Sequence, residues 1–140
     1  MKKIVLLAAA FMFSFAVMAQ TKPEDVIKVN TETHDFGKLK QSVPAIYYFE
    51  ITNISDKPIV VENASASCGC TVPEKPEKPI LPGETAKLKV QYNAAAVAPF
   101  TKDVHIKLAG VDQPKTVHIT GEVLSVEDYD AWVKTKSKGK

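Results

Sequence analysis

The feature that most constrains this 140-residue chain is a series of short runs in which apolar and polar side chains alternate, separated by proline and glycine. Successive side chains of a β-strand point to opposite faces, so a period of two predicts strands with one buried and one wet face. The clear runs have apolar positions at Tyr47, Phe49 and Ile51, at Leu88, Val90 and Tyr92, at Val104, Ile106 and Leu108, and at Val117 and Ile119. Weaker runs cover residues 27–36 and 59–67. The sequence therefore predicts an all-β fold, an immunoglobulin-like antiparallel β-sandwich of about seven strands.

Proline and glycine also predict the connections. Pro82-Gly83 fits the central positions of a type II turn, because proline sets the first φ and glycine accepts the positive one. We expect this turn to lead into a strand over residues 84–92. The prolines at 73, 76, 79 and 82 are spaced as on one face of a polyproline helix. We interpret this segment as a rigid crossover between the two sheets, the alternative being an exposed proline ligand for a partner domain.

The first residues have the pattern of a cleaved secretory signal peptide. Lys2 and Lys3 precede an almost wholly apolar run over residues 4–17, and small side chains lead to a cleavage position after Ala19. The run is too short for a comfortable membrane span, which needs roughly 20 apolar residues. We expect residues 1–19 to be removed on export to the periplasm or cell surface, leaving a soluble chain; a retained anchor is the alternative. The mature chain then divides into an N-terminal tail at 20–26, the immunoglobulin-like domain at 27–123 and a C-terminal segment at 124–140.

The C-terminal segment changes from strand to helix character. Ser125 is suited to cap a short helix that runs through Tyr129 and Trp132. We expect the lysine-rich end to fray from Lys134 onward. Trp132 is expected to pack on the sandwich rather than on a partner.

The charge balance and the missing motifs exclude several functions. All 18 basic residues are lysines, and the acids number 16. Loss of Lys2 and Lys3 with the signal peptide would leave the chain formally neutral, so nucleic acid and anionic membranes lose their main electrostatic attraction. The chain also lacks a Gly-rich phosphate loop, a His-Glu-x-x-His motif and a Gly-x-Ser-x-Gly elbow. We therefore expect no enzyme activity, no nucleic-acid binding and no resident cofactor.

The two cysteines lie two residues apart, in Ser67-Cys68-Gly69-Cys70-Thr71, and the export signal implies an oxidising compartment. In a straight strand their β-carbons would lie about 6.6 Å apart, too far for a disulfide, so a bridge requires a local turn. Gly69 is expected to permit that turn. A ring this small constrains the unfolded chain little, so its reduction would be comparatively easy. Four states stay open: a Cys68–Cys70 disulfide, two reduced thiols, a pair bound to copper(I) or zinc, and a bond to another chain.

Three histidines complete the metal-ligand candidates. His34 lies near the first predicted strand and could approach the cysteines, although a polar group at a strand end is the simpler interpretation. A hairpin centred between Val111 and Asp112 would place His105 directly opposite His118, close enough to share a metal ion. For this pair the simpler interpretation is an ordinary polar sheet surface.

Several motifs together resemble a known bacterial family. In chain order they are His34-Asp35-Phe36-Gly37, Phe49-x-Ile51-x-Asn53, Ser67-Cys68-Gly69-Cys70-Thr71-Val72-Pro73, Leu81-Pro82-Gly83-Glu84, Phe100-x-Lys102 and Ile119-x-Gly121-x-Val123. The combination resembles the family catalogued as domain of unknown function 1573, which is similar to the immunoglobulin-like modules of the Hydin and major sperm protein type. The resemblance implies an exported envelope protein that serves binding or scaffolding, with no established reaction or ligand.

Two hypotheses follow for the function. The first is an exported, non-catalytic immunoglobulin-like module of the bacterial cell envelope that binds an envelope or surface protein through a sheet edge or loop tips. The alternative is a thiol-redox or copper- or zinc-handling protein that acts through Cys68 and Cys70. Thiol reactivity and metal content distinguish the second hypothesis from the first.

Overall fold

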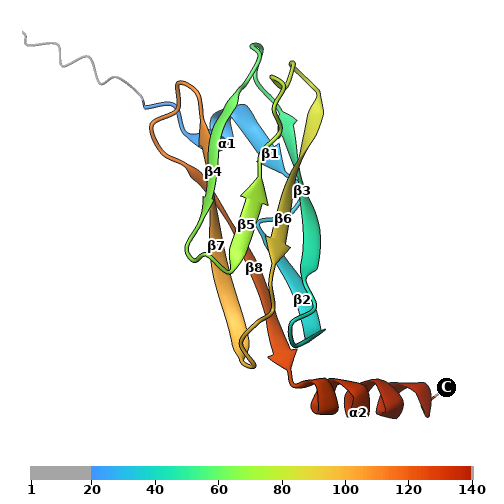
Figure 1. Cartoon of the computed structure of the whole chain (residues 1–140). Coiled ribbons are helices and arrows are strands. Elements are labelled where there is room, and N and C mark those ends of the chain that lie inside the picture. Colours follow the sequence, from blue (N-terminus) through green and yellow to red (C-terminus); the bar gives the residue numbers. More distant parts are fainter. Residues whose placement is uncertain (1–19, 140) are drawn as a thin grey trace, which may run out of the picture.

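The structure, a computed structural model that describes residues 20–139, consists of two four-stranded β-sheets packed face to face (Figure 1). The signal peptide predicted at residues 1–19 lies outside the described residues. Sheet A has the strand order β1 (Ile27–Val29), β3 (Ala45–Asn53), β6 (Thr85–Tyr92) and β5 (Thr71–Glu74). Sheet B has the strand order β2 (Thr33–Lys40), β8 (Lys115–Leu124), β7 (Pro99–Leu108) and β4 (Val61–Ala66). The predicted all-β sandwich is confirmed, with eight strands rather than about seven.

The core lies between the sheets and consists of the side chains that the alternation predicts to point inward. β3 pairs with β6 so that Phe49 lies opposite Leu88, and β7 pairs with β8 so that Val104 lies opposite Val117. The completely buried apolar side chains of these strands are Phe49, Ile51, Leu88, Val90, Val104, Ile106, Leu108, Val117 and Ile119. Burial of this apolar surface is the main force that holds the two sheets together.

The prediction of one strand over residues 27–36 is wrong. β1 ends at Val29 in sheet A, and β2 begins at Thr33 in sheet B. After β1, the N–H of Asn30 donates to the carbonyl of Glu50 at 3.1 Å, and the side-chain Oδ1 of Asn30 accepts the N–H of Glu50 at 3.0 Å. The chain then crosses to sheet B, where β2 pairs with β8 in parallel. Sheet B is therefore mixed and not purely antiparallel.

The proline-rich segment connects two strands of the same sheet, so its predicted role as a crossover between sheets is wrong. β5 includes Pro73 and pairs with β6 in sheet A. An edge strand tolerates proline because one of its sides forms no ladder hydrogen bonds. Further along the segment, Ile80 forms a single bridge to Ile59. The chain changes sheets earlier, between β4 and β5, at residues 67–70.

The turn at Pro82-Gly83 has the predicted geometry. Gly83 has a φ of +79°, and the carbonyl of Leu81 accepts a hydrogen bond from the N–H of Glu84 at 2.9 Å. The turn leads directly into β6.

A short helix, α1 (Pro23–Val26), lies in the segment expected as the N-terminal tail, and Lys115 of β8 ties it to the sandwich. The Lys115 side chain is almost buried and forms ion pairs with Glu24 and Glu32. Burial lowers the pKa of Lys115, but the two carboxylates raise it by more, so the net shift is upward. The ammonium group therefore stays charged and holds the N-terminal segment on β8.

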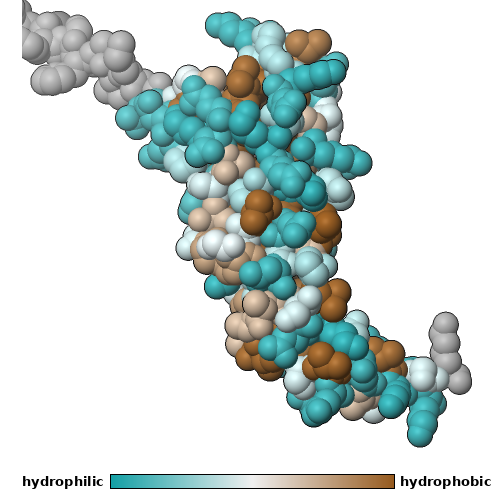
Figure 2. Space-filling model, viewed as in Figure 1, coloured by the Kyte–Doolittle hydropathy of each residue, from teal (hydrophilic) through white to brown (hydrophobic). Residues whose placement is uncertain are grey.

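The C-terminal helix, α2 (Val126–Ser137), leaves one end of the sandwich and buries none of its side chains completely (Figure 1). Ser125 caps it as predicted, because its Oγ accepts the N–H of Asp128 at 3.1 Å. The expected fraying from Lys134 onward is wrong over residues 134–137, where the helix continues through its last-turn lysines, which favour a helix C-terminus, and Lys140 lies outside the described residues. Trp132 is half-buried and meets β2 at Lys38, and apolar groups interrupt the hydrophilic surface along α2 (Figure 2). Within residues 20–139, no helix is long and apolar enough to cross a bilayer.

Candidate functional site

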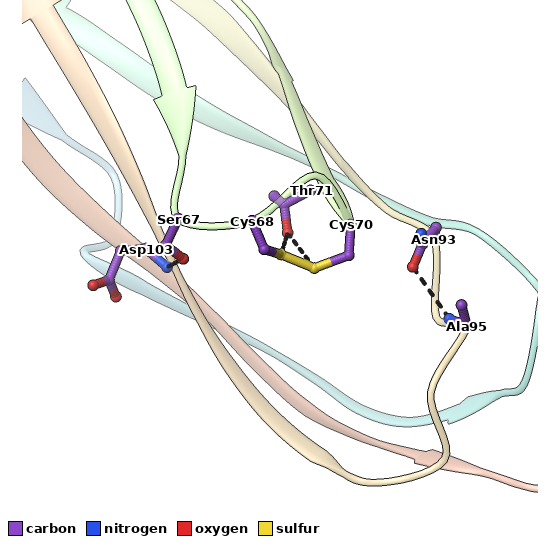
Figure 3. Close-up of a disulfide and its surroundings, with 7 residues drawn as sticks. All are labelled: Ser67, Cys68, Cys70, Thr71, Asn93, Ala95 and Asp103. Carbon is purple, nitrogen blue, oxygen red and sulfur yellow. Dashed lines mark hydrogen bonds between the residues drawn. A yellow bond between two sulfur atoms is a disulfide. The ribbon is translucent and has the colours of Figure 1, made fainter.

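The Cys68-Gly69-Cys70 segment is the connection at which the chain passes from sheet B to sheet A (Figure 3). A disulfide joins the two cysteines within the chain, and their Cα atoms are 5.3 Å apart. Both cysteines are half-buried, and Gly69 between them is exposed. A group that can undergo redox chemistry therefore lies at the surface, where the two sheets are joined.

Backbone hydrogen bonds hold this turn at both ends without help from the sulfurs. At the β4 end, the N–H of Ser67 donates to the carbonyl of Asp103 at 3.0 Å, and the N–H of Asp103 donates to Ser67 Oγ at 3.2 Å. At the β5 end, the N–H of Asn93 donates to the carbonyl of Cys70 at 3.0 Å. The position of the turn is thus set by β7 and by the loop after β6.

The buried hydroxyl of Thr71 faces both sulfurs of the disulfide (Figure 3). Thr71 is 3% exposed, and its Oγ1 lies 3.8 Å from Cys68 Sγ and 3.9 Å from Cys70 Sγ. A hydroxyl bonds weakly to a neutral sulfur and much more strongly to a thiolate, because a charged acceptor strengthens the hydrogen bond. Thr71 is therefore placed to stabilise a thiolate on either cysteine. The sequence marks Thr71 only as a neighbour of the cysteines.

Gly69 is expected from the sequence to permit the turn through unusual torsions, but its φ does not require glycine. Gly69 does not have a left-handed φ, and a Cβ atom there would meet no atom within 4 Å. No residue of the turn has a positive φ. An alanine would therefore fit.

His105 and His118 do not lie opposite each other, so the predicted register of this hairpin is wrong. Asp103 lies opposite His118, and Thr116 lies opposite His105. The register is shifted by an even number of residues, which leaves the buried faces unchanged. The shift arises because Val111 is buried and its N–H bonds back to the end of β7 at 3.3 Å. Each imidazole has its own partner: His118 Nδ1 lies 2.8 Å from an Asp103 oxygen, and His105 Nδ1 lies 3.0 Å from Thr116 Oγ1.

The metal-ligand candidates do not form a cluster in the part of the chain that the structure describes. No three of its His, Cys, Asp and Glu side chains gather into a group that could hold a metal ion. His34 is in β2, at the opposite edge of sheet B from β4 and the cysteine turn. A disulfide sulfur carries no thiolate charge, so copper or zinc could bind Cys68 and Cys70 only after reduction.

His34 lies in a cluster of aromatic rings between β2 of sheet B and β3 of sheet A. Its ring stacks on Tyr47 of β3, with ring centroids 3.5 Å apart, and meets the edge of Phe36 at 4.7 Å. Burial lowers the pKa of His34, opposed by a weaker attraction from the charge of Asp35. His34 is therefore protonated more easily in the unfolded chain than in the folded chain.

This difference predicts a loss of stability in weak acid. The contribution of neutral His34 to the free energy of unfolding is fully present above about pH 6.5, the ordinary histidine pKa. It is lost as the pH falls from there through the lower folded-state pKa. His34→Phe keeps a stacked ring and removes the titration. Between about pH 7.5 and about pH 5.5, we expect the free energy of unfolding, measured with urea, to fall further for the wild-type chain than for the variant. Equal losses would contradict the assignment.

The outer face of sheet A exposes an apolar patch that the alternation does not predict. Ile46 and Tyr48 of β3 and Val72 of β5 are 47%, 48% and 52% exposed. Gln91 of β6 is the cross-strand partner of both Ile46 and Val72, so it lies between the apolar side chains of β3 and that of β5. We call Ile46, Tyr48 and Val72 the sheet A patch. A sequence signal exists, because residues 46–49 are apolar or aromatic at every position and not only at alternate ones.

Comparison with known protein families identifies the domain. A family model described as "Protein of unknown function (DUF1573)" matches residues 27–123. The chain belongs to the DUF1573 family. The matched range begins with β1 and ends within β8, so the DUF1573 domain of this chain is the sandwich itself. No curated protein matches the sequence.

Solved structures similar to this DUF1573 chain have low sequence identity to it. A protein of unknown function from Porphyromonas gingivalis W83 has a TM-score of 0.60 and 16% identity, over 79% of this chain and 51% of that chain. The PapD-like domain 7 of human CEP192 has a TM-score of 0.59 and 9% identity, over 81% and 96%. The VesB protease of Vibrio cholerae has a TM-score of 0.57 and 13% identity, over 72% and 33%. This chain spans about half of the Porphyromonas protein and a third of the protease, and the likeness shows an immunoglobulin-like, PapD-like fold alone.

Proposed function

We propose that the chain is an exported, non-catalytic immunoglobulin-like module of the bacterial cell envelope that binds another protein through the outer face of sheet A. The observation that carries this proposal is the sheet A patch, in which three large apolar side chains, two on β3 and one on β5, are about half exposed on either side of Gln91 of β6. Apolar groups that gather at the surface of a small domain mark an interaction site more often than scattered ones do.

The edges of both sheets are poor places for a partner strand to add. β1 has three residues, and β5 has four and includes Pro73, which has no N–H to donate. β4 and β2 have irregular pairing, at residues 61–63 and 35–38. Short strands, proline and bulges are the devices that prevent strand addition. These features favour the face of sheet A over the sheet edge as the binding surface.

The charges around the patch indicate the chemistry of the partner. The ammonium group of Lys87 lies 6.0 Å from the centre of the Tyr48 ring, and that of Lys89 bonds to Glu74 at 2.9 Å. These two lysines of β6 thus lie beside the apolar side chains of β3 and β5. Because Glu74 already balances the charge of Lys89, Lys87 is the lysine that an acidic group of the partner would complement, beside an apolar contact surface over the patch.

The family description and the fold support a non-catalytic role. The one imidazole–carboxylate pair of the described residues, His118 with Asp103, has no serine or cysteine side chain bonded to the imidazole. A nucleophile bonded to the histidine is what a hydrolytic triad requires. We therefore propose no reaction at this pair.

The patch predicts which substitutions abolish partner capture. A photo-crosslinking amino acid at Gln91 should give one cross-linked envelope protein in living cells, and Ile46→Ser with Val72→Ser should reduce its yield at least tenfold, which corresponds to about 1.4 kcal/mol. Val60→Ser with Leu81→Ser is the matched control, since Val60 and Leu81 are exposed apolar residues outside the patch. Full capture by the patch variant, or no cross-link at all, would contradict the proposed surface.

Export predicts a defined mature N-terminus. Cell fractionation should recover the chain outside the cytoplasm, and its intact mass should correspond to a start at Gln20, because cleavage after Ala19 follows from the signal peptide pattern. Replacement of Leu6 and Leu7 by lysine should trap the full-length chain in the cytoplasm. Recovery of the uncleaved wild-type chain in the cytosol would contradict export.

A further inference from the structure

We propose that the Cys68–Cys70 disulfide is a thiol–disulfide exchange site that accepts two electrons from a dithiol. This goes beyond the proposed binding function and does not depend on the sheet A patch. The substrate class is a pair of cysteine thiols in an exposed or unfolded segment of another envelope protein. Cys68 is the sulfur attacked, Cys70 is the leaving sulfur, and Thr71 is a positioning residue.

The disulfide contributes little to holding the fold together. It closes a ring between cysteines two residues apart, and so small a ring removes little entropy from the unfolded chain. The turn is already anchored by hydrogen bonds from Ser67 to Asp103 and from Asn93 to Cys70. Reduction therefore leaves the turn in place and the two sulfurs close together. A bond that can open and close without unfolding the domain is suited to exchange chemistry.

The surroundings of the two sulfurs distinguish their roles. Both cysteines are half-buried, but Cys70 packs against the hydrophobic core and Cys68 is outside that cluster. An incoming thiolate has to approach in line with the bond that breaks, and the sulfur away from the core offers that approach. Attack at Cys68 Sγ leaves the electron pair on Cys70 Sγ, 3.9 Å from the Thr71 hydroxyl. That hydroxyl donates to the thiolate as it forms.

The exchange is balanced in two steps. In the first step, a substrate thiolate forms a bond to Cys68 Sγ, the Cys68–Cys70 bond breaks, and Cys70 leaves as a thiolate. In the second step, the other substrate thiol loses its proton and attacks the substrate sulfur of this mixed disulfide, so that Cys68 leaves. The substrate dithiol is oxidised to a disulfide, and Cys68 and Cys70 are reduced to thiols that take up the two protons. The direction follows from the small ring, because constrained disulfides are the more oxidising ones.

The first experiment tests whether the disulfide opens in the folded chain. The mature chain is incubated with dithiothreitol, quenched by alkylation and weighed by mass spectrometry, while its near-ultraviolet circular dichroism is followed. We expect both cysteines to be alkylated while the folded spectrum persists. An equimolar synthetic peptide with two cysteines should lose two hydrogen atoms as the chain gains two. A disulfide that is reduced only when the spectrum is lost, or a peptide that stays reduced, would overturn the proposal.

The second experiment tests which sulfur is open to exchange, since a sulfur that a thiolate can attack in the disulfide is also the one that, as a thiolate, can reach a reagent disulfide. Cys70→Ser leaves Cys68 as a lone thiol, and Cys68→Ser leaves Cys70. At equal thiolate fraction, determined from the pH dependence of each rate, we expect Cys68 to react with 5,5′-dithiobis(2-nitrobenzoate) at least tenfold faster than Cys70. Equal or reversed rates would overturn the assignment of Cys68.

The third experiment tests the role of Thr71. Thr71→Val removes the hydroxyl and keeps the shape and burial of the side chain, while Thr71→Ser keeps the hydroxyl. A hydrogen bond to a charged sulfur is stronger than one to a neutral sulfur, so reduction of the Val variant by dithiothreitol should be at least tenfold slower, which corresponds to about 1.4 kcal/mol. The Ser variant should return most of the rate. Equal rates in all three chains, with the folded spectrum unchanged, would overturn the positioning role.

Discussion

Asn53→Ala is expected to lower the free energy of unfolding by about 3 kcal/mol or more, because it leaves several polar groups unpaired at the end of β3. Asn53 is completely buried. Its Nδ2 donates to the carbonyls of Lys57 and Ile80 at 2.7 and 2.8 Å, and its Oδ1 accepts the N–H and the hydroxyl of Ser55, both at 2.8 Å. One side chain thus joins the loop after β3 to the end of the proline-rich segment. Alanine can replace none of these four hydrogen bonds.

Thermal and urea unfolding measure this effect, and for a domain of this size it corresponds to a fall of roughly 10–20 °C in melting temperature. Asn93→Ala is the matched control, because Asn93 is exposed and its side chain accepts one hydrogen bond, from the N–H of Ala95 at 3.1 Å. The control should lose about 1 kcal/mol or less. If the two variants lost similar stability, the buried network would not be what joins these loops.

The strands of the core could be predicted from the sequence because their signal is local. Phe49, Leu88, Val104 and Val117 each lie in a run with a period of two, and all four are buried. The register of the β7–β8 hairpin could not be predicted, because it depends on how Val111 packs into the core. An even shift of register keeps the same faces buried, so the hydrophobic pattern does not distinguish the alternatives.

The candidate site could be predicted only in part. The spacing of Cys68 and Cys70 and the export pattern indicate redox chemistry. The role of Thr71 depends on the path of the turn, which brings its hydroxyl near both sulfurs. The place of the crossover also depends on tertiary structure, because proline in β5 is acceptable only when that strand is at an edge. Non-local packing therefore decides both the position of the cysteine turn and its neighbours.

Most motifs of the DUF1573 resemblance now have a structural reason. Asn53 holds two loops together, Gly83 has the positive φ of a type II turn, and Gly121 packs under Phe100. The Cys68–Cys70 pair is different, since its turn is anchored by backbone hydrogen bonds and its ring is too small to stabilise the fold strongly. A motif without a structural task is the best candidate for a chemical one. This contrast is the reason for placing the exchange site at the cysteine turn.

Gly121→Ala is expected to lower the free energy of unfolding by about 2 kcal/mol, the usual cost of an overpacked core. A Cβ atom at Gly121 would lie 2.8 Å from two carbon atoms of the Phe100 ring and 2.9 Å from the backbone oxygen of Gly37. The Phe100 ring cannot move away easily, because it is buried and stacks on Tyr92 with ring centroids 4.0 Å apart. The oxygen of Gly37 belongs to the irregular stretch of β2, where Gly37 has a φ of +66°.

Gly69→Ala is the matched control, because a Cβ atom there meets nothing within 4 Å and φ is not left-handed. Urea unfolding should show almost no change for this control. In a double-mutant cycle, Phe100→Leu should cost less in the Gly121→Ala chain than in the wild-type chain, because the smaller side chain relieves the contact with the new methyl group. If the two substitutions were simply additive, the contact between Phe100 and Gly121 would not be what requires glycine at this position, and the backbone oxygen of Gly37 would remain as the cause of any loss in the single variant.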